Sequence, residues 1–270
     1  MSASSMRFQV LRRITQLGVL GLFWAGANLG TTVLTGNLSG SRLFGVIPMA
    51  DPFATLQIGA TGHVPGNTVL LGSAITLGLW FLLGGRSFCS WVCPVNLVAD
   101  AAGATKRRLG LVGGYALDRD ARKWVLLLAL VLSATSGVAA FELVSPIGMI
   151  HRELIFGVGM GLLAVPVLFL VDLFLLRRGW CGSVCPLGAF WSFVGRKSPV
   201  GIRFDDATCD RCMDCVKVCP EAHVLNFNEL SNTGFVDSGD CTRCGRCVEV
   251  CNPSATSFTI RPLGTRGSRS

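Results

Sequence analysis

The chain has 270 residues, of which half are apolar and only 15% charged, and its mean hydropathy is +0.54. This composition argues against a soluble protein, which must cover its surface with more charged residues, and favours a lipid bilayer as the solvent. The net charge of +8 does not predict nucleic-acid binding, because Lys and Arg flank apolar runs instead of forming one patch.

Four apolar stretches are long enough to cross about 30 Å of hydrocarbon at about 1.5 Å per residue. Few charges interrupt them, which disfavours the alternative of core helices in a large soluble protein. The sequence therefore predicts a membrane domain over residues 1–198 with four transmembrane helices at approximately Ile14–Thr35, Asn67–Leu83, Lys123–Phe141 and Leu154–Leu176.

Positive charges near these stretches predict their orientation. The N-terminal arm carries Arg7, Arg12 and Arg13, and Lys and Arg are frequent between the second and third stretches. The other loops carry only Arg42 and Arg152. Because cytoplasmic loops retain positive charge, we expect a multi-pass protein of the bacterial inner membrane with N- and C-termini in the cytoplasm. A cleaved signal peptide is the alternative for the N-terminus, but the first apolar run is too long for one.

A C-x3-C-P motif occurs twice, at Cys89, Cys93 and Pro94 and again, 92 residues later, at Cys181, Cys185 and Pro186. The motifs Asp51-Pro52 and Ser145-Pro146 lie at nearly the same offset, which predicts two parallel hairpin repeats. Cysteines at i and i+4 share one helix face, so the four thiols are candidates for a further metal or cluster site or for redox-active dithiols. The alternative is that they are small buried apolar residues.

Residues 199–260 are polar and contain eight cysteines in two runs of the bacterial ferredoxin type, C-x2-C-x2-C-x3-C. In such runs the fourth cysteine binds the other cluster. The sequence predicts two [4Fe–4S] clusters, one held by Cys209, Cys212, Cys215 and Cys251 and the other by Cys241, Cys244, Cys247 and Cys219. Zinc is the alternative, but zinc sites usually pair two separate C-x2-C knuckles. One departure is Asn252, which separates Cys251 from Pro253.

The remainder of this region predicts a small cytoplasmic α+β ferredoxin domain. Alternating residues at 224–227 and 257–260 predict short strands, with helical turns near the cysteines. Residues 261–270 are rich in Arg, Gly and Ser and are predicted to be a disordered tail.

The loop before the fourth stretch contains two candidates for a quinol site, His151 and Glu153. A quinol headgroup needs an apolar slot and a group that accepts its protons, which a histidine titrating near neutrality provides. Asp51, Gln57 and His63 are neighbours under the repeat prediction. The alternative is that these polar residues only anchor a helix end at an interface.

Taken together, these motifs resemble the NapH family, the membrane-bound ferredoxin-type quinol dehydrogenase subunits of periplasmic nitrate reductase systems. The resemblance covers nearly the whole chain and includes Leu56-Gln57 and His151-Arg152 beside the cysteine motifs. It implies oxidation of quinol and onward electron transfer through a periplasmic iron–sulfur partner of the NapG type toward nitrate reductase.

Two other functions fit the same motifs. Related membrane ferredoxins with C-x3-C-P motifs include assembly or maturation factors, in which these thiols would reduce a metal or thiol of a partner enzyme. The chain would alternatively serve as an anchor for other electron-transfer subunits, with its clusters in a structural role.

Overall fold

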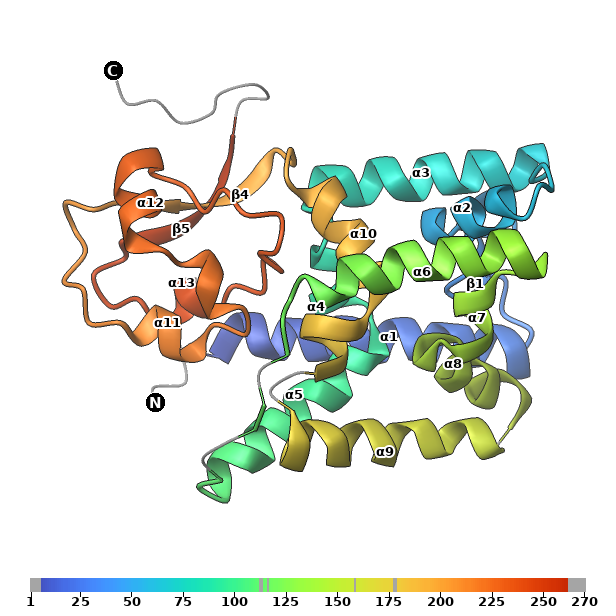
Figure 1. The fold of residues 1–270 in the computed structure, drawn as a ribbon, viewed down its shortest axis with the longest axis horizontal. Helices are drawn as coiled ribbons and strands as arrows, with labels where there is room; N and C mark the ends of the chain where they lie inside the picture. The colour runs from blue at the N-terminus through green and yellow to red at the C-terminus, as the bar shows by residue number, and fades with distance from the viewer. Residues whose placement is uncertain (1–5, 112–113, 116, 158, 177–178, 262–270) are drawn as a thin grey trace. The chain divides into compact units, whose positions relative to one another are not determined.

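The computed structural model describes residues 6–111, 114–115, 117–157, 159–176 and 179–261. The chain forms two compact units. The first unit consists of three segments, Met1–Thr15, Leu79–Val92 and Trp191–Ser270. The second consists of Gln16–Gly78 and Cys93–Phe190. Figure 1 follows the chain from its N-terminus in blue to its C-terminus in red.

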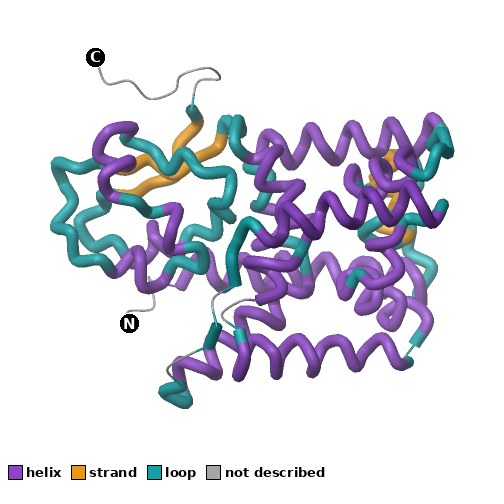
Figure 2. The backbone as a smooth tube through the Cα atoms, in the orientation of Figure 1, coloured by secondary structure: helices purple, strands orange, loops and turns teal. Residues whose placement is uncertain are grey.

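Most of the second unit is helical (Figure 2). Helices α1 (Arg7–Asn28) and α3 (Asn67–Leu83) each have residues in both units, as does α10 (Pro186–Gly195). The other α-helices of the second unit are α2 (Pro52–Ala60), α5 (Pro94–Arg108), α6 (Ala121–Ser136), α7 (Ala140–Val144), α8 (Pro146–Phe156) and α9 (Ala164–Leu170). Short 3₁₀ and π turns complete it, namely η2 (Met160–Leu163), η3 (Val171–Leu175) and η4 (Trp180–Val184).

A small antiparallel sheet in the second unit was not predicted from the sequence. Its strands β1 (Leu34–Gly36), β2 (Gly40–Leu43) and β3 (Ile47–Ala50) are adjacent in chain order. In its register Leu34 faces Leu43 and Gly40 faces Ala50. These strands are only three or four residues long, too short for an alternating pattern to stand out in the sequence.

Helices α2 and α8 begin in the same way. Asp51 caps α2 by accepting a hydrogen bond from the N–H of Phe53, and Ser145 caps α8 by accepting one from Gly148. A proline follows each cap, where its missing N–H costs no helical hydrogen bond. The motifs Asp51-Pro52 and Ser145-Pro146, 94 residues apart, therefore form equivalent helix N-termini.

The structure contradicts the prediction of four transmembrane helices. Among the described residues, no helix is long and apolar enough to cross a bilayer. Helices α3 and α6 have 17 and 16 residues, fewer than the roughly 20 that a hydrocarbon core requires. Helix α1 has 22 residues but includes Arg7, Arg12 and Arg13. The predicted multi-pass location in the inner membrane, with both termini cytoplasmic, is contradicted by the same finding.

The fourth predicted span is not one helix. Helix α8 ends at Phe156, and the next residue, Gly157, has φ of 100°, which favours glycine over residues with a side chain. The chain then continues through η2, α9 and η3, which follow one another directly from Met160 to Leu175. A continuous apolar sequence is therefore divided by its backbone conformation.

The cysteine-rich part of the first unit surrounds a two-stranded antiparallel sheet (Figure 1). Strand β4 (Val200–Phe204) pairs with β5 (Thr256–Ile260), with Ile202 facing Phe258. The helices of this unit are α4 (Ser87–Trp91), α10 (Pro186–Gly195, which starts in the second unit), α11 (Asp214–Val218), η5 (Ala222–Val224), α12 (Phe227–Thr233) and α13 (Arg246–Val250).

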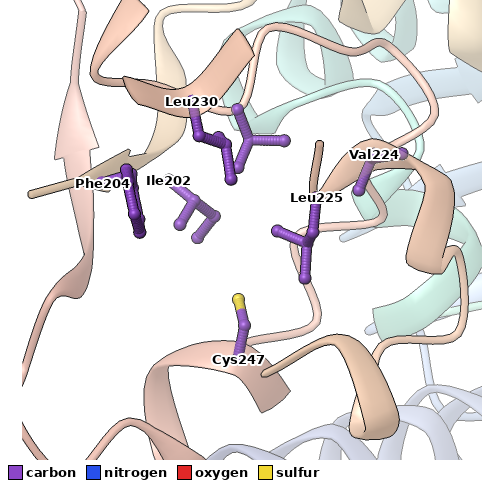
Figure 3. Close-up of a cluster of buried hydrophobic side chains, with 7 residues drawn as sticks. Ile202, Phe204, Val224, Leu225, Leu230 and Cys247 are labelled. Atoms are coloured by element: carbon purple, nitrogen blue, oxygen red, sulfur yellow. The ribbon is translucent and has the colours of Figure 1, made fainter. Parts of the chain in front are cut away.

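The core of this region is a cluster of buried apolar side chains next to the cysteines. Figure 3 shows the sulfur of Cys247 directed toward the space between Ile202 and Leu225. The predicted strand at 257–260 lies within β5, but 224–227 is not a strand. Asn226 instead caps α12, its side chain accepting a hydrogen bond from the N–H of Asn228. The predicted disordered tail lies outside the described residues from 262 onward.

Candidate iron–sulfur centre

Four cysteines surround a cavity near the surface of the first unit, which we call the outer cavity. They are Cys209, Cys212, Cys215 and Cys251, the set predicted for one cluster. Cys212 is exposed and the other three are half-buried. Phe204, Phe227 and Ala255 provide apolar walls. Cys251 thus joins the three cysteines of the other run.

The inner cavity of the same unit is lined by Cys219, Cys241, Cys244 and Cys247, the set predicted for the other cluster. Cys244 and Cys247 are buried, with 7% and 9% of their surface exposed. Ile202, Leu225 and Val236 form the apolar wall. The structure therefore brings each predicted set of four thiols around one cavity.

Left-handed residues explain how such closely spaced cysteines face one cavity. In the first run Arg211 and Met213 have φ of 55° and 64°, and in the second Arg243 and Gly245 have φ of 48° and 77°. These turns direct backbone N–H groups at sulfur. The N–H of Arg211 donates to Cys209 Sγ at 3.4 Å, and that of Arg243 donates to Cys241 Sγ.

The thiols require positive charge before they can all be ionised. Burial raises the pKa of Cys219 to about 12, with the nearby Cys244 and Cys241 adding to the shift. Burial also raises the pKa of Cys247 and of Cys241. Iron cations supply such charge, and metal binding then displaces the thiol protons. Four cysteines in an apolar setting are the donor set of an iron–sulfur cluster, so the residues fit this group.

A single metal ion fits less well. Within the described residues, no three His, Cys, Asp or Glu side chains are grouped closely enough to hold one ion. In a cubane each thiolate binds a different iron, so the sulfur atoms surround a wider space. Four thiols arranged around each cavity agree with the cubane prediction.

Helix α4, far earlier in the chain, fastens the loop that starts the second run. Arg86 donates to the carbonyl of Asp240 at 2.9 Å, Ser90 to that of Thr242 at 2.7 Å, and Trp91 to that of Arg243 at 3.2 Å. This contact was not predicted from the sequence, because no local motif marks donors that act across about 150 residues of chain.

Buried charges lie beside the inner cavity. Arg86 donates to the carboxylate of Glu221 at 3.0 Å, and Glu221 lines the cavity. Although burial acts in the opposite direction, Glu221, Cys89 and Asp240 together raise the pKa of Arg86. His223 contacts Asp240 at 3.0 Å and Glu221 at 3.7 Å. This network was not predicted from the sequence, because Arg86 is far from Glu221 and Asp240 along the chain.

The C-x3-C-P cysteines occupy similar local structures in the two repeats. Cys93 precedes α5 and Cys185 precedes α10, both in extended conformation and both followed by the first proline of a helix. Both are buried, whereas Cys89 and Cys181 are half-buried. Cys89 lies on α4 in the first unit and the other three in the second unit. Their joint ligation of a metal or cluster stays a prediction.

The quinol candidates lie in the second unit and differ in their surroundings. His151 is 1% exposed and packs edge-on against Phe23, and neither ring nitrogen has a hydrogen-bond partner among the described residues. Burial lowers its pKa to about 4. Glu153 instead accepts a hydrogen bond from the N–H of Gly161 at 3.0 Å.

Gln57 stands at the position of α2 that corresponds to His151 in α8, and it is completely buried. Its oxygen accepts hydrogen bonds from Ser133 and from the N–H of Phe141, whereas its side-chain nitrogen has no partner in the residues that the structure describes. The third neighbour, Asp51, is a helix cap whose pKa is raised to about 7 by burial and by Glu142. His63 is exposed and contacts Thr61 at 2.9 Å.

Comparison with known families locates iron–sulfur sequence patterns in both units. A 4Fe-4S dicluster domain matches residues 201–252, which contain both ferredoxin runs. A second family, described as a 4Fe-4S binding domain, matches twice, at residues 66–111 and 158–204. Each of these two matches contains one C-x3-C-P motif, which supports the internal repeat.

Curated relatives cover most of the chain, although no solved structure matches it. The methylamine utilization ferredoxin-type protein MauN of Methylorubrum extorquens is 42% identical over 85% of this chain and 81% of its own length. The ferredoxin-type protein NapH of Escherichia coli is 43% identical over 82% of this chain and 77% of its own. A putative electron transport protein of the same species, YccM, is 33% identical over 65% and 53%. From its cysteine runs and these relatives, the chain belongs to the family of ferredoxin-type proteins with 4Fe-4S domains that includes NapH and MauN.

Proposed function

We propose that this ferredoxin-type protein is a quinol dehydrogenase subunit with two [4Fe–4S] clusters, one in each cavity of the first unit. The observation that carries the proposal is the crossed grouping of the eight cysteines, with Cys251 in the outer set and Cys219 in the inner set. When bound, such clusters take up and release one electron at a time.

The chain's own residues prepare these sites for electron transfer. Apolar walls limit water around the thiols of the inner cavity, while the exposed Cys212 leaves the outer cavity accessible to a partner. Backbone N–H groups directed at Cys209, Cys219 and Cys241 stabilise the thiolate form.

His151 is the proposed contact for the quinol. A quinol releases two electrons and two protons when it becomes a quinone. With a pKa of about 4 the ring is neutral at pH 7, so one nitrogen can accept a hydrogen bond from a quinol hydroxyl. Within the part of the chain that the structure describes, neither buried nitrogen has a partner, which supports a ligand at this position. Glu153 is the second candidate proton acceptor.

The proposed electron acceptor is a nitrate reductase chain, reached through an iron–sulfur partner of the NapG type. Relatedness to NapH supports this assignment. MauN is equally similar, and its name refers to methylamine utilization, so a redox system of that kind is the alternative acceptor. Reduction of each purified acceptor system by the quinol-treated chain distinguishes the two.

Cluster content and quinol reactivity test the proposal in one preparation. In the anaerobically purified full-length chain, the two ferredoxin runs are expected to contribute about eight iron and eight sulfide per chain, apart from any iron at the C-x3-C-P cysteines. Adding duroquinol should produce EPR signals of reduced clusters. His151→Leu should slow this reduction at least tenfold while dithionite still reduces both clusters. A lack of sulfide would refute the cluster assignment, and unchanged kinetics would remove His151 from the quinol site.

The C-x3-C-P cysteines are proposed to form an additional redox or metal site, because the matching family is described as a 4Fe-4S binding domain. The double variant Cys93→Ser with Cys185→Ser is expected to lose the iron of this additional site and to keep the iron of the two ferredoxin runs. If this variant keeps all iron but no longer supports maturation of a partner enzyme, the assembly-factor alternative is favoured.

A further inference from the structure

The two cysteine runs place an arginine at the same position, directly before the second cysteine. Arg211 precedes Cys212, and Arg243 precedes Cys244. Both arginines have left-handed backbones, with φ of 55° and 48°. Each lines the cavity of its own run. The two positions are equivalent in sequence and backbone, so any difference between them lies in their surroundings.

Arg243 is buried, with 3% of its surface exposed. Its guanidinium donates only to backbone carbonyls, those of Val200 at 2.8 Å, Gly84 at 2.5 Å, Cys241 at 3.0 Å and Gly195 at 3.0 Å. In the described part of the chain it forms no ion pair with a carboxylate. The charged groups that it senses are Cys241 and Arg261. Its hydrogen bonds are complete, but its positive charge is not neutralised by an acid.

Arg211 has the opposite environment. Its side chain is 66% exposed and lies 3.5 Å from the carboxylate of Asp206. The outer cavity also includes the acidic Asp210, where the second run has the neutral Thr242. Glu221 is an acid at the inner cavity, but it is paired with Arg86 at 3.0 Å. The inner cavity therefore carries one uncompensated positive charge that the outer cavity lacks.

A buried charge without a partner is costly, so a structure that retains one implies a compensating charge. Four thiolates around iron provide negative charge in the inner cavity, and reduction adds one more electron. A nearby cation stabilises the more negative state. We propose that Arg243 makes the inner cluster the one with the higher reduction potential, an inference that rests on the proposed function.

The effect of the Arg243 charge on the reduction potential outweighs the opposing effect of burial. A unit charge about 6 Å from the reacting centre, at an effective dielectric constant of about 20, shifts an equilibrium on the order of 100-fold. Burial of Cys244 and Cys247 acts in the opposite direction, because it disfavours added negative charge. Arg211 contributes little, since exposed ion pairs are screened by water. Arg243 is thus the charge that sets the order of the two potentials.

EPR redox titration of the full-length chain tests the order without altering Arg243. Cys212→Ser changes the spectrum of the outer cluster and so identifies its signal. In the wild-type chain, the inner signal should appear at the higher potential, with at least a tenfold higher ratio of reduced to oxidised cluster at any fixed potential. The reverse order, or equal potentials, would overturn the proposal.

Variants then test the cause. Arg243→Gln should lower the reduced-to-oxidised ratio of the inner cluster at least tenfold, and Arg243→Lys, which keeps the charge, should restore most of it. The matched control Arg211→Gln should change the outer cluster less than threefold. An assembled Arg243→Gln chain with an unchanged inner potential overturns the role of Arg243.

If Arg243→Gln does not assemble, the wild-type order and the Arg243→Lys chain still decide the outcome. Iron and sulfide content separates this inference from the proposed function. A chain that lacks two clusters refutes the proposed function, whereas two clusters with the wrong order of potentials refute only the role of Arg243.

Discussion

Arg86 and Glu221 form an ion pair with 3.0 Å between nitrogen and oxygen, and their side chains are only 2% and 4% exposed. Removing Glu221 takes a close carboxylate away from the buried Arg86 charge, and the Asp240 carboxylate lies farther off, at 4.0 Å. We therefore expect Glu221→Ala to lower the free energy of unfolding by about 3 to 5 kcal/mol. Denaturant unfolding of the two chains, followed by circular dichroism, measures the difference.

The exposed pair of Lys217 and Asp214 provides the matched control in the same unit. Its side chains are 70% and 44% exposed, so Lys217→Ala should change the free energy of unfolding by less than about 1 kcal/mol. Equal effects of the two substitutions would show that burial of the Arg86 pair contributes nothing.

The crossed cysteine sets predict which cluster each serine variant damages. Cys251 belongs to the second run in sequence but lines the outer cavity with Cys212. Cys251→Ser should therefore perturb the same EPR signal as Cys212→Ser, and Cys219→Ser should perturb the signal affected by Cys247→Ser. If Cys251→Ser changed the signal of Cys247→Ser instead, each run would hold its own cluster.

His151 predicts a pH dependence of stability. Its pKa in the folded chain is about 4, below the value of about 6.5 for an unfolded chain. Between these values the unfolded chain binds the additional proton, so the free energy of unfolding should rise with pH from about 4 to about 6.5 and then level off, by at most about 3 kcal/mol.

His151→Leu should remove this slope in urea unfolding measured from pH 4 to pH 7.5. Wild type measured over the same pH range serves as the reference. A slope that persists in His151→Leu would mean that other groups cause it.

Gly85 is expected to tolerate no side chain. Its φ is 59°, and an added Cβ would lie 2.6 Å from the Cα of Gly195 and also collide with the carbonyl of Trp191. Gly85→Ala should cost about 3 kcal/mol or more, from strain and overpacking together. Gly110 has φ of 63° with open space around it, so Gly110→Ala should cost only about 1 kcal/mol. Chemical denaturation midpoints compare the two.

Local sequence signals predicted several elements of this fold. The bounds Asn67–Leu83 predicted for the second apolar stretch are those of α3. The cysteines of each run are separated by only two or three residues, and this spacing indicated the sets of thiols that line each cavity. Such features depend on neighbouring residues, which is why a sequence reveals them.

Other features depend on backbone breaks or distant contacts. Apolar composition did not reveal that the fourth stretch is interrupted at Gly157, because glycine is also common inside helices of apolar sequences. The donors of α4 and the burial of Arg243 depend on residues far away in the chain. Arg211 and Arg243 hold the same position in their runs, but one is exposed and the other is buried by residues far away in the chain.

The contact of α4 with the carbonyls of Asp240, Thr242 and Arg243 also bears on how the protein matures. During synthesis the ribosome releases residues 79–92 long before it reaches the second cysteine run. The inner cavity can take its final shape only when that early segment folds onto the late one. Iron–sulfur insertion at this cavity is therefore expected to follow completion of the chain, and a separately expressed C-terminal region should load it poorly.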